Sequence, residues 1–175
     1  PEDELIGLIE ELNTDKQVDG IMVQLPLPKH IQESNVLERI SPSKDVDGLT
    51  SINLGKLFKN DSSAIAPATA KGILELLKEY EIDIEGKDAV VIGRSDIVGL
   101  PTAALLQNEN ATVTVCHSHT PNIKEVCKMA DILVVAIGKP EYIDKEYVKE
   151  GAVVIDVGTN KNEEGKLVGD VNFES

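Results

Sequence analysis

The residues best suited to chemistry form a short turn, Gly93-Arg94-Ser95, with a second glycine, Gly99, close behind it. An apolar run over 89–92 precedes the turn and predicts a buried strand, and helical spacing begins near residue 98. A glycine turn between a strand and a helix lets backbone N–H groups approach a dinucleotide pyrophosphate. Five residues separate the two glycines, which is not the G-x-G-x-x-G spacing, so a turn without a ligand remains the alternative.

The second strand of this pattern, over 112–116, indicates which dinucleotide would bind. NAD sites normally carry an Asp or Glu at the end of this strand for the ribose 2′-hydroxyl. Here the strand ends in Cys116-His117-Ser118-His119-Thr120, which contains no carboxylate. Ser118 and Arg94 could instead donate hydrogen bonds to a 2′-phosphate. The sequence therefore predicts NADP as the cofactor, with an exposed turn as the alternative role for the two histidines.

Two further turns follow the next expected strands, over 132–137 and 152–157. Gly138 follows the first strand, and Gly158 and Thr159 follow the second. Open α/β sheets bind ligands at the carboxyl ends of their strands, so we expect Gly138 and Thr159 to lie at the cofactor site. Ordinary turns at the ends of strands are the alternative for both.

Two other candidates lie early in the chain. Gln24 ends an expected strand over 21–25, just before a proline-rich stretch. Asp45 and Asp47 lie two residues apart, and in an extended segment both would point to one side. A calcium loop would need a third ligand before the glycine and a later Glu, which are missing. A carboxylate that binds an N–H-rich ligand and a solvated turn remain open.

The surrounding elements predict an α/β chain with two domains. Helices are expected over 3–13 and 33–40, and residues 59–68 are typical of a linker. Beyond it, Thr69 could cap a helix to residue 80, and further helices are expected over 122–129 and 144–149. Strands alternating with helices predict a Rossmann-type parallel sheet. We assign residues 1–66 to part of an α/β substrate domain and 67–175 to the NADP domain.

Composition excludes several classes of protein. Seventeen basic against 31 acidic residues give a net charge of −14, which disfavours nucleic acid and anionic membranes as partners. The two cysteines form no metal-binding motif, and we expect no metal and a cytoplasmic location. No signal peptide or membrane span is expected. Motifs of hydrolase triads, zinc proteases and P-loop enzymes are missing from the sequence.

Taken together, five segments give the chain a family resemblance. In order they are Val23-Gln24-Leu25-Pro26-Leu27-Pro28, Pro42-Ser43-Lys44-Asp45-Val46-Asp47-Gly48, the turn from Gly93 to Pro101, Asp156-Val157-Gly158, and Val168-Gly169-Asp170-Val171. This pattern resembles the bifunctional methylenetetrahydrofolate dehydrogenase/cyclohydrolases over nearly the whole chain. The resemblance implies NADP-dependent oxidation of 5,10-methylenetetrahydrofolate, followed by hydrolysis of the methenyl product to 10-formyltetrahydrofolate. It also implies a homodimer that acts on tetrahydrofolate derivatives.

The resemblance further implies roles for single residues. Gln24 would tune a catalytic lysine, and Asp47 would hold the pterin ring, whose edge offers N–H donors. Arg94, Ser95 and Ser118 would contact NADP.

The sequence departs from the family pattern at several points. No Y-x-x-x-K segment with the family's catalytic lysine precedes Gln24, and the late P-G-G-V-G-P segment is missing. Ala68 and Ala70 replace a usual Cys and Pro, and Thr159 replaces a usual Ile. A chain limited to these 175 residues is expected to lack cyclohydrolase activity. The alternatives are a non-catalytic or dehydrogenase-only NADP-binding chain, and a reductase of the shikimate-dehydrogenase type, for which no Lys/Asp pair can be placed.

Overall fold

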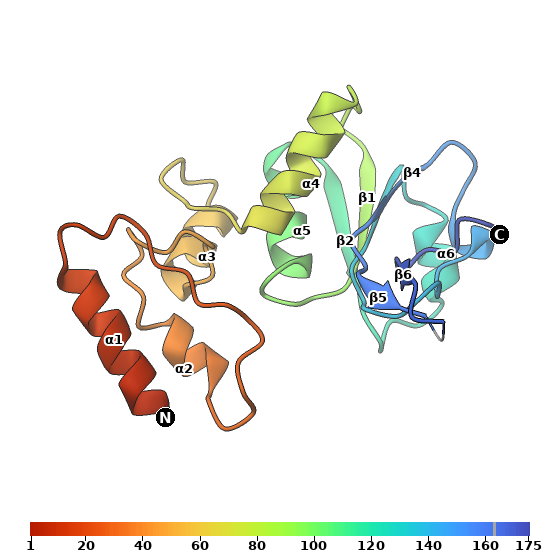
Figure 1. Ribbon diagram of the computed structural model, residues 1–175. Helices are drawn as coiled ribbons and strands as arrows, with labels where there is room; N and C mark the ends of the chain where they lie inside the picture. Colours follow the sequence, from red (N-terminus) through yellow and green to blue (C-terminus); the bar gives the residue numbers. More distant parts are fainter. Residues whose placement is uncertain (163) are drawn as a thin grey trace. The chain divides into compact units, whose positions relative to one another are not determined.

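The computed structural model describes residues 1–162 and 164–175, which divide into two compact units. The first unit covers Pro1–Ala68 and the second Thr69–Ser175 (Figure 1). The first unit contains helices α1 (Glu2–Thr14), α2 (Glu33–Leu37) and α3 (Ser51–Phe58). Nearly all the regular structure of the second unit belongs to a parallel sheet with helices on its faces. The expected α/β fold class is confirmed.

The first unit is held together by the apolar side of α1. Ile9 is buried there against Ile21, Val36 and Ile40, and partly buried leucines and isoleucines surround this cluster. At the start of α1, the Glu2 carboxylate accepts hydrogen bonds from the backbone N–H of Gln32 and from the Asn35 side chain, both at 2.7 Å. These bonds tie the loop before α2 to the helix.

The prediction of a strand over 21–25 is wrong. Only Ile21 pairs, through a single parallel bridge to Asp45, and the next residue, Met22, is 60% exposed. Pro26 and Pro28 cannot donate to a ladder, so the segment has few means of extending the pairing.

Helix α3 had not been expected. It begins after Thr50, whose hydroxyl oxygen accepts from the N–H of Asn53 at 3.4 Å, as a helix N-cap does.

The sheet of the second unit has four parallel strands in the order β2-β1-β3-β4. Strand β1 (Asp88–Ile92) lies between β2 (Thr112–Cys116) and β3 (Ile132–Val135), and β4 (Val153–Asp156) follows at the edge. A short antiparallel hairpin, β5 (Asn160–Lys161) with β6 (Leu167–Val168), was not anticipated from the sequence. The carboxyl ends of all four parallel strands therefore lie on the same side of the sheet, as the sequence pattern predicted.

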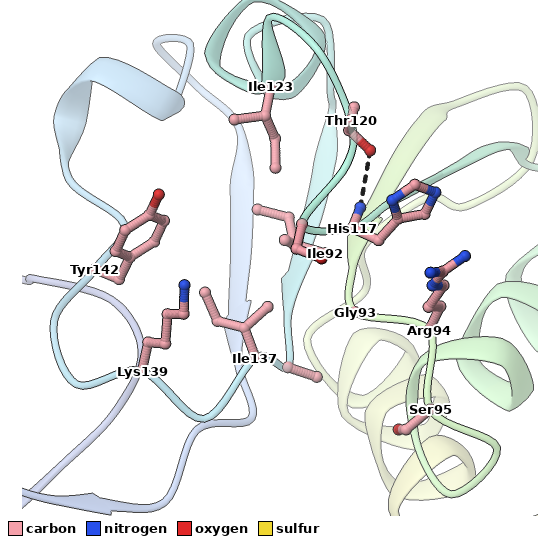
Figure 2. Close-up of a pocket in the computed structure, with 12 residues that line it drawn as sticks. Ile92, Gly93, Arg94, Ser95, His117, Thr120, Ile123, Ile137, Lys139 and Tyr142 are labelled. Carbon is pink, nitrogen blue, oxygen red and sulfur yellow. Dashed lines mark hydrogen bonds between the residues drawn. The ribbon is translucent and has the colours of Figure 1, made fainter.

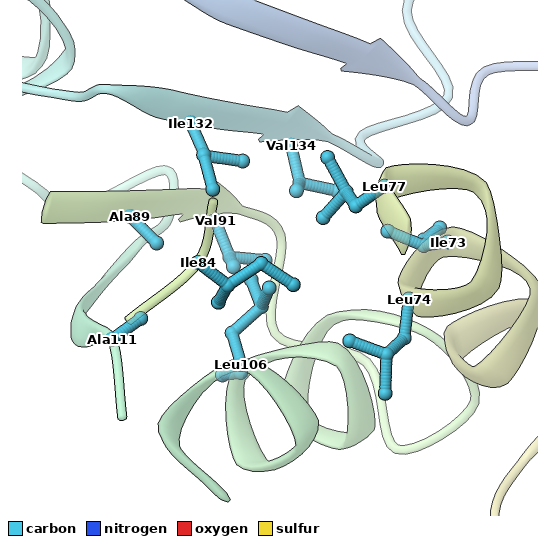
Figure 3. Close-up of a cluster of buried hydrophobic side chains, with 11 residues drawn as sticks. Ile73, Leu74, Leu77, Ile84, Ala89, Val91, Leu106, Ala111, Ile132 and Val134 are labelled. Carbon is cyan, nitrogen blue, oxygen red and sulfur yellow. The ribbon is translucent and has the colours of Figure 1, made fainter. Parts of the chain in front are cut away.

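Helices cover both faces of this sheet. On one face, α4 (Ala68–Glu79) and α5 (Gly99–Asn108) pack Leu77 and Leu106 against Val91 and Val134 (Figure 3). On the other face, α6 (Ile123–Cys127) and the 3-10 turn η1 (Lys145–Tyr147) cover alternate residues of the same strands. Side chains alternate along a strand, so both sides of β1 and β3 are buried. This explains their nearly continuous apolar sequence.

Several expected helix boundaries shift: the helices expected over 33–40 and 122–129 are shorter, covering Glu33–Leu37 and Ile123–Cys127. Helix α4 begins at Ala68, so Thr69 lies inside it and is not its cap. The helix expected over 144–149 is only η1, preceded by Asp144, whose carboxylate accepts from the N–H of Glu146. Among the described helices, none has both the length and the apolar character needed to cross a bilayer. Within the same residues, no cluster of three or more His, Cys, Asp or Glu could hold a metal ion.

Candidate functional site

The glycine turn after β1 is so tight that two positions exclude any side chain. Gly93 has a φ of +124°, and a Cβ atom there would lie 2.3 Å from the carbonyl oxygen of Ala136, the residue after β3. A Cβ on Gly99 would lie 2.3 Å from the carbonyl oxygen of Gly93. The second glycine therefore lets the start of α5 approach the turn itself, which is why the longer spacing still makes a compact turn.

Ser95 closes the turn onto the helix. Its hydroxyl oxygen accepts from the N–H groups of Val98, at 3.2 Å, and Gly99, at 3.4 Å. Its carbonyl oxygen accepts from the N–H of Leu100 at 3.0 Å. Ser95 thus satisfies N–H groups at the beginning of α5 that have no partner within the helix. The positive end of the helix dipole is directed at the same turn.

A cavity of about 370 Å³ opens beside this turn at the carboxyl ends of β1, β2 and β3 (Figure 2). Its volume is within the range of small-molecule sites. Its lining combines an apolar part with a polar rim, and consists of Ile92, Gly93, Arg94, Ser95, His117, Ser118, Thr120, Ile123, Ala136, Ile137, Lys139 and Tyr142. The isoleucines provide a surface for a flat ring, and the rim provides hydrogen-bond donors.

The charge of the rim is opposite to that of the whole chain. The lining contains Arg94 and Lys139 but no Asp or Glu. Arg94 makes no ion pair with any described residue, while the Lys139 ammonium lies 4.8 Å from the centre of the Tyr142 ring, as a cation–π contact. Figure 2 shows Arg94 and Lys139 on opposite sides of the cavity. The cavity is therefore suited to an anionic ligand despite the net charge of −14.

The loop after β2 is ordered by its own hydrogen bonds. The N–H of His117 donates to the Thr120 hydroxyl at 2.9 Å, and the N–H of His119 donates to Nδ1 of His117 at 3.2 Å. Beneath the loop, a hydrogen bond with Cys127 lowers the pKa of the buried Cys116 thiol to about 7, although burial opposes the shift.

The residues predicted for the cofactor fall into two groups. Gly93, Arg94, Ser95 and Ser118 all line the cavity. Gly138 lies between two lining residues and has a φ of +64°, while the exposed Thr159 lies outside the lining. The role of each of these residues in cofactor binding stays a prediction.

Sequence reasoning missed most of the apolar lining and one side of the rim. Ile92 is the last residue of β1 and Ile137 follows β3 by two residues, and the apolar pattern there indicates only burial. Lys139 and Tyr142 follow Gly138, and neither carries a recognisable motif. The one available signal was position, since both follow the carboxyl end of a parallel strand.

In the first unit, the two neighbouring aspartates have different environments. Asp45 is 1% exposed, and its carboxylate accepts from the N–H groups of Thr50 (2.9 Å) and Leu49 (3.2 Å) and from the Asn53 amide (2.9 Å). Burial raises the pKa of Asp45, but the hydrogen bonds outweigh it and hold this pKa below its usual value. Asp47 is half-buried and accepts no hydrogen bond from the described residues.

The premise of an extended segment was wrong, because the chain turns over 45–48, where the N–H of Gly48 donates to the carbonyl oxygen of Asp45 at 3.3 Å. Gly48 explains the tightness of this turn, since a Cβ there would lie 2.2 Å from the carbonyl oxygen of Ile65. Gln24 is exposed, and its amide nitrogen donates only to the carbonyl oxygen of Leu25, at 3.0 Å, among the described residues. Asp47 and Gln24 both keep polar atoms available to a ligand.

Comparison with known proteins gives a consistent family. The model of the tetrahydrofolate dehydrogenase/cyclohydrolase NAD(P)-binding domain matches residues 67–175, and the model of the catalytic domain of the same enzymes matches residues 1–47. The chain belongs to the tetrahydrofolate dehydrogenase/cyclohydrolase family. The resemblance stated from the sequence motifs is confirmed.

Individual relatives of the family agree along nearly the whole chain. The chain is 63% identical to the bifunctional protein FolD of Ligilactobacillus salivarius, over 99% of its own length and 61% of the relative's. The FolD crystal structure from Campylobacter jejuni is 51% identical, with a TM-score of 0.96 over 99% of this chain and 61% of that one. The FolD structure from Trypanosoma brucei, complexed with NADP cofactor and inhibitor, is 43% identical, with a TM-score of 0.90 over 99% and 62%. The chain thus spans about 60% of the length of these relatives.

Proposed function

We propose that the protein oxidises 5,10-methylenetetrahydrofolate with NADP and hydrolyses the methenyl product to 10-formyltetrahydrofolate. Residues 67–175 would bind NADP, and residues 1–66 would contribute to the folate site. The observation that carries the proposal is the cavity beside the Gly93 turn, which combines two cations and no carboxylate with an apolar wall. Membership in the family supports the same activity.

The donors around the cavity fit NADP better than NAD. Arg94 has no ion-pair partner among the described residues and lines the cavity together with Ser118. A guanidinium and a hydroxyl can both donate to a 2′-phosphate, and no carboxylate in the lining repels it. The glycines at 93 and 99 let the start of α5 pack close against the turn, and the positive end of a helix dipole attracts phosphate groups. When bound, NADP would accept the hydride from the methylene bridge.

Two residues of the first unit are proposed for the folate. The Asp47 carboxylate is an acceptor without a partner in the described chain, and it would hold the N–H groups of the pterin edge. The Gln24 amide, which is exposed, would hydrogen bond to the catalytic lysine of the family. Asp45 would act differently, since its hydrogen bonds are already made within its own turn.

The test is to measure NADP reduction by the intact protein with 5,10-methylenetetrahydrofolate, with NAD in parallel. Turnover that prefers NADP is the expected result. Hydrolysis of 5,10-methenyltetrahydrofolate is measured separately, because it tests the second activity. NADP binding without turnover would favour the non-catalytic alternative, and failure to bind NADP would overturn the cofactor assignment.

Two further properties belong to the proposal. The family resemblance supports a homodimer that uses tetrahydrofolate derivatives, and sedimentation of the intact protein would test the dimer. A cytoplasmic location is consistent with two buried cysteines that are free thiols. Fractionation of cells that express the protein would test it.

A further inference from the structure

The carboxylate of Asp170 lies behind the cofactor cavity and is completely buried. Its Oδ2 atom accepts from the backbone N–H groups of Ile137 (2.7 Å) and Gly138 (3.0 Å). Its Oδ1 atom accepts from the N–H of Lys139 (2.8 Å) and from the side-chain amide of Asn160 (2.8 Å). Three consecutive N–H groups of the loop after β3 therefore converge on a single side chain.

The backbone beside Asp170 contacts the same loop further along. The carbonyl oxygen of Asp170 accepts from the N–H of Ile143 at 2.9 Å, and that of Gly169 accepts from the N–H of Glu141 at 3.0 Å. The loop from Ile137 to Ile143 is thus held over its whole length by two residues. Since Ile137, Lys139 and Tyr142 all line the cavity, this loop forms one wall of it.

A second aspartate fixes Asp170 in turn. Asp156, at the end of β4, accepts from the N–H groups of Gly158 and Asp170, both at 2.9 Å, and from that of Val171 at 3.0 Å. A Cβ on Gly158 would lie 2.4 Å from Asp170, and a Cβ on Gly169 would lie 1.8 Å from Asp156. A side chain at Gly158 or Gly169 would therefore collide with one of the two aspartates, so this arrangement requires glycine at both positions.

We infer that Asp170 is a positioning residue for the cofactor: it fixes the cavity wall formed by Ile137, Lys139 and Tyr142, opposite Arg94. This inference rests on the proposed function, in which the cavity binds a dinucleotide. Asp170 does not touch the cavity, and its charge is balanced by four donors. Asp170 therefore affects the shape of the wall and not the recognition of the 2′-phosphate. NADP and NAD would both contact this wall, so substitution of Asp170 should weaken the binding of both.

The experiment compares Asp170→Asn with a matched change, Asp131→Asn, in the intact protein. Asp131 also accepts from a backbone N–H, that of Asp88 at 2.9 Å, and from Lys149 at 2.7 Å, but it lies before β3 and outside the cavity lining. The dissociation constants of NADP and NAD are measured by calorimetry, well below the unfolding temperature of each variant. Amide hydrogen exchange of Ile137, Gly138 and Lys139 is followed in parallel.

Asp170→Asn is expected to raise both dissociation constants about tenfold, to leave their ratio unchanged, and to speed exchange at the three amides, because an amide nitrogen cannot accept their hydrogen bonds. Asp131→Asn is expected to change neither dissociation constant. If Asp170→Asn does not fold, Asn160→Ala is used, which removes one donor from Asp170; it is expected to weaken both dinucleotides about threefold.

The inference is overturned if Asp170→Asn, or Asn160→Ala in its place, binds both dinucleotides as tightly as the unmodified protein. It is also overturned if Asp131→Asn weakens binding to the same extent, because the effect would then be a general loss of stability. If the unmodified protein itself fails to bind NADP, the proposed function fails instead, and this outcome is visible before any variant is compared.

Discussion

Each unit of the molecule contains a pair of aspartates close to a required glycine, and the two pairs are used differently. In the second unit, Asp156 and Asp170 both accept several backbone N–H groups. In the first unit, only Asp45 does so, and Asp47 accepts no hydrogen bond from the described residues. A carboxylate whose acceptor positions are filled by its own chain stabilises a turn, whereas one without partners can bind a ligand.

The same distinction applies to the positive charges of the cavity. Lys139 has a contact within the chain, on the Tyr142 ring, while Arg94 makes no ion pair with any described residue. Arg94 in the second unit thus corresponds to Asp47 in the first, because both keep a charged group available to a ligand. The comparison separates residues that shape the sites from residues that would contact ligands, and substitutions can test each assignment.

The largest effect is expected from Asp47→Asn. The change removes a negative acceptor and introduces a donor opposite the pterin N–H groups, so kcat/KM for 5,10-methylenetetrahydrofolate should fall about 100-fold. The free energy of unfolding should stay the same, because no described residue donates to this carboxylate. Steady-state kinetics and urea unfolding are measured on the same preparation. A large loss of stability with unchanged kinetics would reverse the roles of the two aspartates.

Asp45→Asn, the same change two residues earlier, is expected to give the opposite pattern. The new amide would face the N–H donors of Thr50 and Asn53, so the free energy of unfolding should fall by about 2 kcal/mol. In the fraction that remains folded, KM for the folate should change little. Urea unfolding with an active-site titration checks both points. If folate binding is lost while stability is kept, Asp45 rather than Asp47 contacts the substrate.

Arg94→Gln should weaken NADP binding about tenfold and leave NAD binding almost unchanged, because the guanidinium would contact only the 2′-phosphate. Lys139→Gln is the matched control on the opposite side of the cavity. It should alter the affinities for NADP and NAD by the same small factor, since its ammonium lies on Tyr142. Fluorescence titration with both dinucleotides measures the ratio. An equal loss of both dinucleotides in Arg94→Gln would contradict the assignment of Arg94 to the 2′-phosphate.

The parallel sheet could be predicted because its strands are short apolar runs that alternate with helical periodicity. Val91 and Val134, for example, are buried against α4 and α5, and the residues on either side of each are apolar. The prediction of a strand over 21–25, by contrast, was wrong. An apolar run predicts burial, but a strand also needs a partner, and Ile21 finds one only at Asp45.

The candidate site was predictable where backbone geometry restricts the residue type or where a motif indicates the chemistry. Gly93 and Gly99 could be recognised in the sequence as parts of a tight turn, because no side chain fits at either position. Arg94 and Ser118 followed from the chemistry of a 2′-phosphate and from the family motifs. The position of Lys139 after a strand was the one local signal for it, whereas the hydrogen bond that holds its N–H comes from Asp170, which is 31 residues away in the sequence. Long-range hydrogen bonds of this kind have no local signal.

The smallest expected effect concerns pH and again separates Asp45 from ordinary core residues. The pKa of Asp45 is below its usual value in the folded state, so the unfolded chain binds a proton at a higher pH than the folded one does. The stabilisation by Asp45 should therefore be complete above about pH 5, and it should be lost as the pH falls from the unfolded value of about 3.9 through the lower folded value.

The measurement is the difference in unfolding free energy between the unmodified protein and Asp45→Asn, taken from pH 6 to pH 3, and the difference should shrink with acid. Val36→Ala is the control, because Val36 is fully buried in the same unit and its loss removes packing but no titrating group. The stability difference for Val36→Ala should be independent of pH. If the difference for Asp45→Asn is equally independent, the hydrogen bonds to Asp45 do not favour its charged form, and the contrast between the two aspartates would rest on burial alone.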